Sequence, residues 1–194
     1  AVSGASACSL CAVGYYADDT ASLTCALAGA GKYAVDGSGV ATNSGAVDVA
    51  LCTNGFYSGP GSTVCKVAPK GSYAIAGAGS ATYCTAGTYS ETYGLSECTA
   101  CSAGKYSQFN ASECIDAQDG YIAVDINDGV VTEGAVKELE CPAGKYSKQQ
   151  GVSQCMSCQA GYISANTGAL QCTACSEGKY DTGTQTVCQY CPMG

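Results

Sequence analysis

The apolar residues of this chain recur at fixed places in a short unit, with no long amphipathic element. Each unit begins at an opening position, typified by Cys141, and carries Gly three residues later and Tyr five residues later. A closing cysteine follows the opening one by about fourteen residues, and the next unit opens three residues beyond it. The common unit is therefore 16 to 17 residues long, and the chain is a tandem repeat protein.

The register of the repeat is fixed by its glycines. Gly stands three residues after every opening position, and Tyr occupies the fifth position in eight of the ten complete units, with Ile122 and Ile163 in the other two. Such a glycine predicts a positive φ or a close approach of another backbone, and the tyrosine predicts a short strand. We expect the tyrosine ring to cover the disulfide or to stack on the next unit. The opening positions are Cys11, Ala28, Cys52, Ala68, Cys84, Cys101, Ala117, Cys141, Cys158, Cys175 and Cys191.

A second glycine lies four residues before the closing position and predicts a turn. Asn110, which also tolerates the left-handed region, replaces it once. Each unit should then be a strand, a turn and a return toward the closing cysteine, which is a small hairpin closed by its own disulfide. The second glycines are Gly45, Gly61, Gly77, Gly94, Gly134, Gly151 and Gly168.

The cysteine pairing follows from units in which cysteines are missing. Ala28, Ala68 and Ala117 replace the opening cysteine, and in each of these units the closing cysteine is also absent. Because an unpaired thiol is a liability in an oxidising compartment, this joint loss pairs opening with closing cysteine. The predicted disulfides are Cys11–Cys25, Cys52–Cys65, Cys84–Cys98, Cys101–Cys114, Cys141–Cys155, Cys158–Cys172 and Cys175–Cys188.

Zinc is the competing interpretation. Cys155-x2-Cys158 followed by Cys172-x2-Cys175 resembles a zinc ribbon with a slightly short loop. A zinc site would need the four cysteines at the two ends of a unit. In the three units without a cysteine pair of their own, the joint losses leave two of these four ligands or fewer, which argues against zinc. Disulfides are favoured, and no cofactor or metal is expected.

Two units, 28–51 and 117–140, are longer and lack cysteine pairs. In the second, Ile122, Val124 and Ile126 alternate as in a strand, and Asp128-Gly129 offers a hairpin turn. Two interpretations are open: these hairpins replace the missing disulfide by packing, or they contact another subunit.

Composition agrees with a disulfide scaffold. Among 194 residues there are 16 Cys, 26 Gly and 14 Tyr, but 2 Phe, 2 Met and no Trp. Large aliphatics are sparse, so no unit can bury a core alone, whereas each disulfide closes a loop worth roughly 3 kcal/mol. Disulfide scaffolds persist in oxidising compartments, which places the chain outside the cell or in the secretory lumen.

Charge and the missing residue types exclude several functions. The net charge is −8, with 8 lysines and no arginine, so nucleic-acid binding is not expected. Without histidine the chain lacks the commonest general base, and we expect no enzyme activity. No run of 18 apolar residues is present, so no segment of this chain is expected to span a membrane.

Two short motifs add candidate chemistry. Asn110-Ala111-Ser112 is an N-glycosylation sequon at a predicted turn. Asp125, Asn127 and Asp128 could hold calcium, but Val136 stands where an EF-hand needs its bidentate Glu, so a solvated turn is favoured.

The repeat also sets the expected organisation. Residues 1–10 end a preceding unit, 11–116 and 117–190 are tandem repeats that each include one long unit, and 191–194 begin a further unit ending at Gly194. Cys8 closes a unit without an opening partner, and Cys191 opens one that does not close. Either their partners lie in a longer chain, or Cys191 of one subunit bonds Cys8 of the next, head to tail.

The segments CPAGKYS, CSAGKYS and CTAGTYS, with C-x2-C at the closing end, resemble the ephrin-receptor-like cysteine-rich repeats, relatives of TNF-receptor cysteine-rich modules of about EGF-like size. The similarity runs along the whole chain and is most specific in 84–114 and 141–191; protist variant surface antigens are similar less closely. It implies an irregular, elongated, disulfide-laddered extracellular fold without catalysis.

The predicted fold is thus a small disulfide-rich, mainly β or irregular, elongated array of disulfide-closed hairpins. The predicted function is structural: a rod-like extracellular subunit or segment of a surface filament, coat or appendage, self-associating head to tail. The alternative is a ligand-binding or adhesion ectodomain of a cell-surface receptor or surface antigen.

Overall fold

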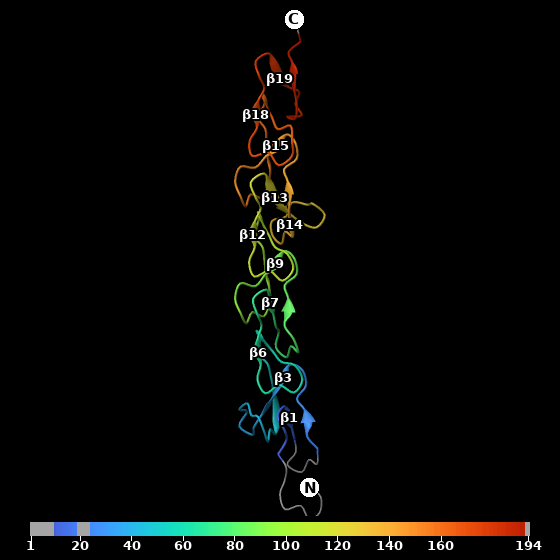
Figure 1. Ribbon diagram of the computed structural model, residues 1–194, viewed down its shortest axis with the longest axis vertical. Helices are drawn as coiled ribbons and strands as arrows, with labels where there is room; N and C mark the ends of the chain where they lie inside the picture. Colours follow the sequence, from blue (N-terminus) through green and yellow to red (C-terminus); the bar gives the residue numbers. More distant parts are fainter. Residues whose placement is uncertain (1–9, 19–23, 193–194) are drawn as a thin grey trace, which may run out of the picture. The chain divides into compact units, whose positions relative to one another are not determined.

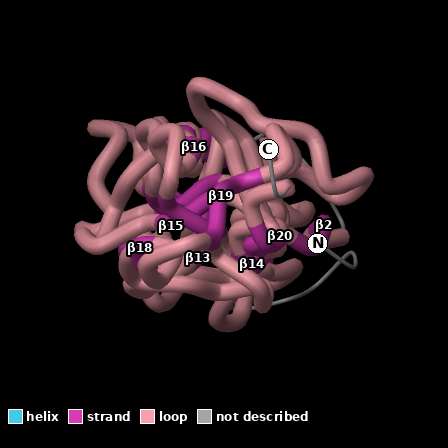
Figure 2. The backbone as a smooth tube through the Cα atoms, turned by 90° about the horizontal axis from the view of Figure 1, so that it is seen from above, coloured by secondary structure: helices cyan, strands magenta, loops and turns pink. Residues whose placement is uncertain are grey.

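The computed structural model describes residues 10–18 and 24–192, which form short β-strands joined by turns and loops (Figure 1). Loops make up most of the chain, as the view from above also shows (Figure 2). No helix long and apolar enough to cross a membrane occurs among the described residues. The predicted fold class, a tandem array of disulfide-closed hairpins, is confirmed.

Twenty strands pair as ten two-stranded antiparallel sheets in the described part of the chain. Each sheet joins two strands that are consecutive in sequence. The strands are β1 (Tyr15–Tyr16), β2 (Ala26–Leu27), β3 (Lys32–Val35), β4 (Asp48–Leu51), β5 (Phe56–Tyr57), β6 (Lys66–Val67), β7 (Ser72–Tyr73), β8 (Thr82–Tyr83), β9 (Thr88–Tyr89), β10 (Thr99–Ala100), β11 (Lys105–Tyr106), β12 (Ile115–Asp116), β13 (Tyr121–Val124), β14 (Lys137–Glu140), β15 (Lys145–Tyr146), β16 (Met156–Ser157), β17 (Tyr162–Ile163), β18 (Thr173–Ala174), β19 (Lys179–Asp181) and β20 (Cys188–Tyr190).

Each hairpin follows the sequence repeat closely. In repeat 141–157, Gly144 takes a φ of 83°, and β15 then pairs with β16, so that Tyr146 lies opposite Met156. The return strand is made of the two residues between the closing cysteine and the next opening one. The N–H of Cys158 then donates to the carbonyl of Gly144 at 2.9 Å. The C-x2-C spacing therefore places a strand between two cysteines of different disulfides.

The chain divides into two compact units. The first comprises Ala1–Cys84 and Ser90–Cys98, and the second comprises Thr85–Tyr89 and Thr99–Gly194. Within each unit, hairpins contact the next repeat and in several cases the repeat after that, through the same backbone atoms.

Contact between neighbouring repeats is made by the second glycine. Its N–H donates to the carbonyl of the residue that opens the repeat before its own. In the second unit Gly151 donates to Ala117 (2.9 Å) and Gly168 donates to Cys141 (2.8 Å) in this way. In the first unit, Gly61 donates to Ala28 at 2.7 Å in the same way. A side chain is not needed for this bond, which explains why repeats of different composition stack alike.

Contact between alternate repeats explains the first glycine. A Cβ added to Gly104 would overlap the carbonyl oxygen of Gly151, and one added to Gly14 would overlap that of Gly61. Gly104 also has a φ of 79°, a conformation that side-chain-bearing residues rarely adopt. Both reasons predicted from sequence, a positive φ and a close approach, therefore apply to this glycine.

The core is built from small residues. Nine of the eleven opening positions are buried whether they hold Cys or Ala, while Cys175 is half-buried and Cys191 exposed; Cys101 and Ala117 are both 0% exposed. In five of the seven disulfide-containing repeats, the sixth residue after the opening is a buried Ser that donates to a backbone carbonyl, as Ser107 does to Thr88 (3.0 Å). In the three cysteine-free repeats this position is a buried alanine, Ala34, Ala74 or Ala123.

The repeated tyrosines are half-buried in seven repeats, and Tyr180 is exposed. Their backbones extend the stack: Tyr57 forms a parallel bridge with Ala78 of the next repeat, and Tyr106 does so with Ala135. The closely packed centre thus consists of cysteine, alanine and serine, with the tyrosines around it.

The long hairpin of the second unit packs against the next repeat. Ile122 and Val124 of β13 are buried against Cys141, with Val152 and Cys155 beside them. The aliphatic residues of repeat 117–140 therefore cover the disulfide of the next repeat, which supports the packing interpretation for this hairpin.

Candidate interaction surface

The disulfides leave little free sulfur chemistry. Seven bonds join each opening cysteine to the closing cysteine of its own repeat, 13 or 14 residues away. These are the pairs that the joint losses predict from the sequence. No group of three or more metal-ligating side chains occurs within residues 10–18 and 24–192. Cys155 and Cys158, the candidate zinc pair, belong to two different disulfides.

Cys191 is the exposed free thiol of the described chain. Its N–H donates to the carbonyl of Gly178 at 2.9 Å, as the other opening residues do to the preceding first glycine. It therefore occupies the opening position of a repeat. Cys8 and Gly194 lie outside the described residues.

A row of cross-strand pairs recurs along the hairpins, and most of its side chains are exposed or half-buried, although Ser72 is buried. Each pair joins the residue four after the opening position, called here the fourth residue, to the residue just before the next opening position. In the first unit two of these pairs are wholly apolar, Tyr15 with Leu27 and Phe56 with Val67, and all four side chains are between 39% and 47% exposed. Large apolar side chains held on an exposed face indicate a contact surface.

In the second unit three pairs at the same positions make polar or charged contacts. Lys105 and Asp116 form an ion pair at 2.8 Å, and the Tyr121 hydroxyl donates to Glu140 at 3.0 Å. Lys179 lies over the ring of Tyr190, 4.6 Å from its centre. The same structural position therefore carries apolar pairs in two repeats of the first unit and polar or charged contacts in three repeats of the second.

The fourth position also alternates between repeats. Counting repeats from the one that opens at Cys11, the fourth residue is aromatic in four of the five odd-numbered repeats and lysine in four of the five even-numbered ones. Because alternate repeats touch through their glycines, aromatics and lysines fall on different sets of hairpins within each unit. In chain order the residues are Tyr15, Lys32, Phe56, Ser72, Thr88, Lys105, Tyr121, Lys145, Tyr162 and Lys179. Sequence reasoning missed this row; the two-repeat period of the fourth residue is the signal that reveals it.

A polar cluster links alternate repeats in the second unit. The carboxylate of Glu140 accepts hydrogen bonds from the hydroxyls of Thr167 (2.5 Å) and Tyr121 (3.0 Å). These two hydrogen bonds lower the pKa of Glu140, and the bond from Thr167 has the larger effect. The hydrogen bond to the same carboxylate raises the pKa of Tyr121. The pKa of Tyr106 is raised by partial burial and then by the charge of Glu138.

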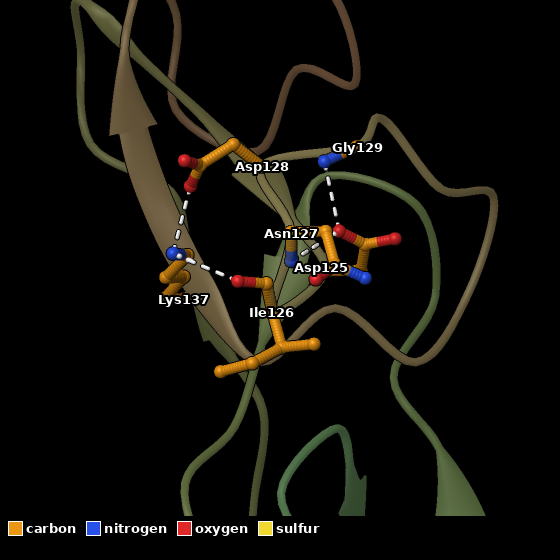
Figure 3. Close-up of polar contacts among 6 residues, drawn as sticks. All are labelled: Asp125, Ile126, Asn127, Asp128, Gly129 and Lys137. Atoms are coloured by element: carbon orange, nitrogen blue, oxygen red, sulfur yellow. Dashed lines mark hydrogen bonds and ion pairs between the residues drawn. The ribbon is translucent and has the colours of Figure 1, made fainter.

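The loop suggested as a calcium site is a turn in which the Asp125 side chain accepts hydrogen bonds from the backbone of the same turn. The Asp125 carboxylate accepts the N–H groups of Asn127 and Gly129, both at 2.8 Å (Figure 3). Asp128, with a φ of 65°, forms an ion pair with Lys137 at 2.7 Å. This arrangement fits the solvated turn favoured from sequence.

Asn110 lies at the exposed tip of the second turn of its repeat, with a φ of 61°. Ser112 of the sequon is also exposed.

No protein-family model and no curated protein matches the chain. The hairpins and their local disulfides are those of a cysteine-rich repeat module. The narrower likeness to ephrin-receptor-like or TNF-receptor-like repeats rests on the sequence motifs alone.

Proposed function

We propose that the protein is a structural extracellular repeat protein, a subunit or segment of a surface filament, coat or appendage that self-associates end to end. The observation that carries this proposal is the backbone nature of the stacking contact. Second glycines donate to the repeat before in seven repeats, and first glycines lie against a second-glycine carbonyl in six, so a further repeat can be added through the same backbone contacts, whatever its side chains.

The local disulfides support this role. Because each bond closes its own repeat, none of the seven ties one repeat to another. A neighbouring repeat can therefore come from the same chain or from a second copy. Seven disulfides also favour an extracellular or cell-surface location, where they persist. The role is non-enzymatic in this proposal and involves neither cofactor nor nucleic acid, since His and Arg are absent.

In the proposed assembly, the contact that first glycines such as Gly104 make inside the chain forms between repeats of two copies. Cys191 of one copy then bonds Cys8 of the next. A heterologous contact of this kind extends into a filament.

The test is assembly of the oxidised full chain, followed by sedimentation velocity and electron microscopy. We expect linear assemblies that lengthen with concentration, and a ladder on a non-reducing gel that Cys191→Ser removes. Gly178→Asn should shorten them, because Asn tolerates a positive φ but places a side chain in the contact.

Gly39→Asn is the matched control. Gly39 also has a positive φ and nothing near an added Cβ, and Asp128 occupies the aligned position in the other long repeat. This variant should assemble like the parent. A parent protein that stays monomeric at every concentration would refute the structural role.

The second candidate is a ligand-binding or adhesion ectodomain, favoured by the apolar pairs Tyr15–Leu27 and Phe56–Val67. In that case a monomeric protein should bind cells, and Phe56→Ser should reduce binding without changing the disulfides. Glycans are expected in either role, because both place the chain in the secretory route.

A further inference from the structure

The second turn of repeat 101–116 carries an asparagine with a positive φ in place of the usual glycine. At this turn seven repeats use glycine, with φ between 64° and 77°, whereas repeat 101–116 uses Asn110. A residue with a Cβ is less favourable here than glycine by roughly 1–2 kcal/mol, Asn least so. Conformation alone therefore permits Asn110 but does not favour it over glycine.

The residues around Asn110 supply a reason for it. Asn110-Ala111-Ser112 is the sole Asn-x-Ser or Asn-x-Thr sequence in the 194 residues, although the chain has five asparagines. Ala111 is fixed by a parallel bridge to Tyr89, while Asn110 and Ser112 are exposed on either side of it. No hydrogen bond of the described residues involves the Asn110 amide or the Ser112 hydroxyl. The acceptor amide is thus accessible in the folded repeat.

Other repeats show what a side chain at this turn meets. The nearest atoms to a Cβ added to the equivalent glycines belong to surface side chains, Leu27 at 3.1 Å from Gly61, Val67 at 3.2 Å from Gly94 and Asp116 at 2.6 Å from Gly151, and at Gly134 there is nothing within 4 Å. The stacking contacts use the backbone of this turn instead. Because Asn110 is itself exposed, a group carried on its amide can extend into solvent.

We propose that Asn110 carries an N-linked glycan; this inference rests on the extracellular location in the proposed function. The donor is a lipid-linked oligosaccharide pyrophosphate. Nδ2 of Asn110 bonds to C1 of the first sugar, the bond from C1 to the pyrophosphate oxygen breaks, the lipid pyrophosphate leaves, and Nδ2 loses one proton. The glycan covers the exposed Phe109 and keeps this turn out of lateral contacts.

The test is secretion of the full chain from eukaryotic cells, followed by intact mass measurement before and after peptide N-glycosidase treatment. The parent should lose one glycan mass and gain Asp at position 110. Ser112→Ala keeps the asparagine but removes the sequon, and Asn110→Gly restores the residue of the other repeats. Both variants should be secreted with seven disulfides and no enzyme-sensitive mass.

A parent chain without enzyme-sensitive mass, or a Ser112→Ala variant that keeps it, would overturn the inference. Neither result affects the structural role, which is judged separately by assembly of the deglycosylated chain.

Discussion

At the scale of single residues, the repeat depends on residues that are small. Glycine is required twice, once where two backbones meet and once where a turn donates to the previous repeat. The opening residue is buried between these contacts and tolerates Cys or Ala, as Cys101 and Ala117 demonstrate. A cysteine pair can therefore be exchanged for alanine without changing the stack.

This gives a prediction for the disulfide of repeat 101–116. The double variant Cys101→Ala/Cys114→Ala should fold and lose about 3 kcal/mol of unfolding free energy in urea titration, the entropy of a loop of this size. Cys101→Ser/Cys114→Ser should lose about 1–3 kcal/mol more, because a hydroxyl at the fully buried position 101 would lack a partner. If the two double variants were equally stable, the buried opening position would not prefer alanine to serine, contrary to this prediction.

At the scale of the element, most of the hairpin could be predicted from sequence. Paired absences of cysteine indicate the seven disulfide partners, and the glycine positions indicate the turns. The sequence predicts a return toward the closing cysteine but does not locate the return strand, because two residues such as Met156–Ser157 have no alternating pattern to identify them. The exposed row of the first unit was missed for the same reason: each repeat contributes only two of its residues.

The long hairpins give a prediction at this scale. Val124→Ala should lower the unfolding free energy by about 1.5–3 kcal/mol, because Val124 is fully buried against the next repeat. Val130→Ala also removes two methyl groups, from a side chain of the same hairpin that is 52% exposed. It should change the unfolding free energy by less than about 0.5 kcal/mol. Urea unfolding measures both. Similar losses would mean that the hairpin does not replace a disulfide by packing.

At the scale of the whole molecule, stability is distributed along the chain because repeats contact only their near neighbours. The stability of such an array is a sum of contacts between nearby repeats. Local unfolding should therefore be easiest where repeats meet through exposed polar groups. This property does not follow from composition: the bond from Thr167 to Glu140 joins residues 27 apart, and neither belongs to the repeat signature.

The Glu140 contact makes one such link sensitive to acid. Because the pKa of Glu140 is lowered in the folded protein, its contribution is complete above the carboxyl's ordinary pKa and disappears as the pH falls through the lowered one. The N–H of Gly168, which donates to Cys141 beside this contact, should exchange faster with solvent below that pH. Glu140→Gln should remove this pH dependence, whereas Glu177→Gln, an exposed acid in a neighbouring repeat, should keep it. If Gly168 exchange responds to acid equally in both variants, another group holds repeats 117–140 and 158–174 together.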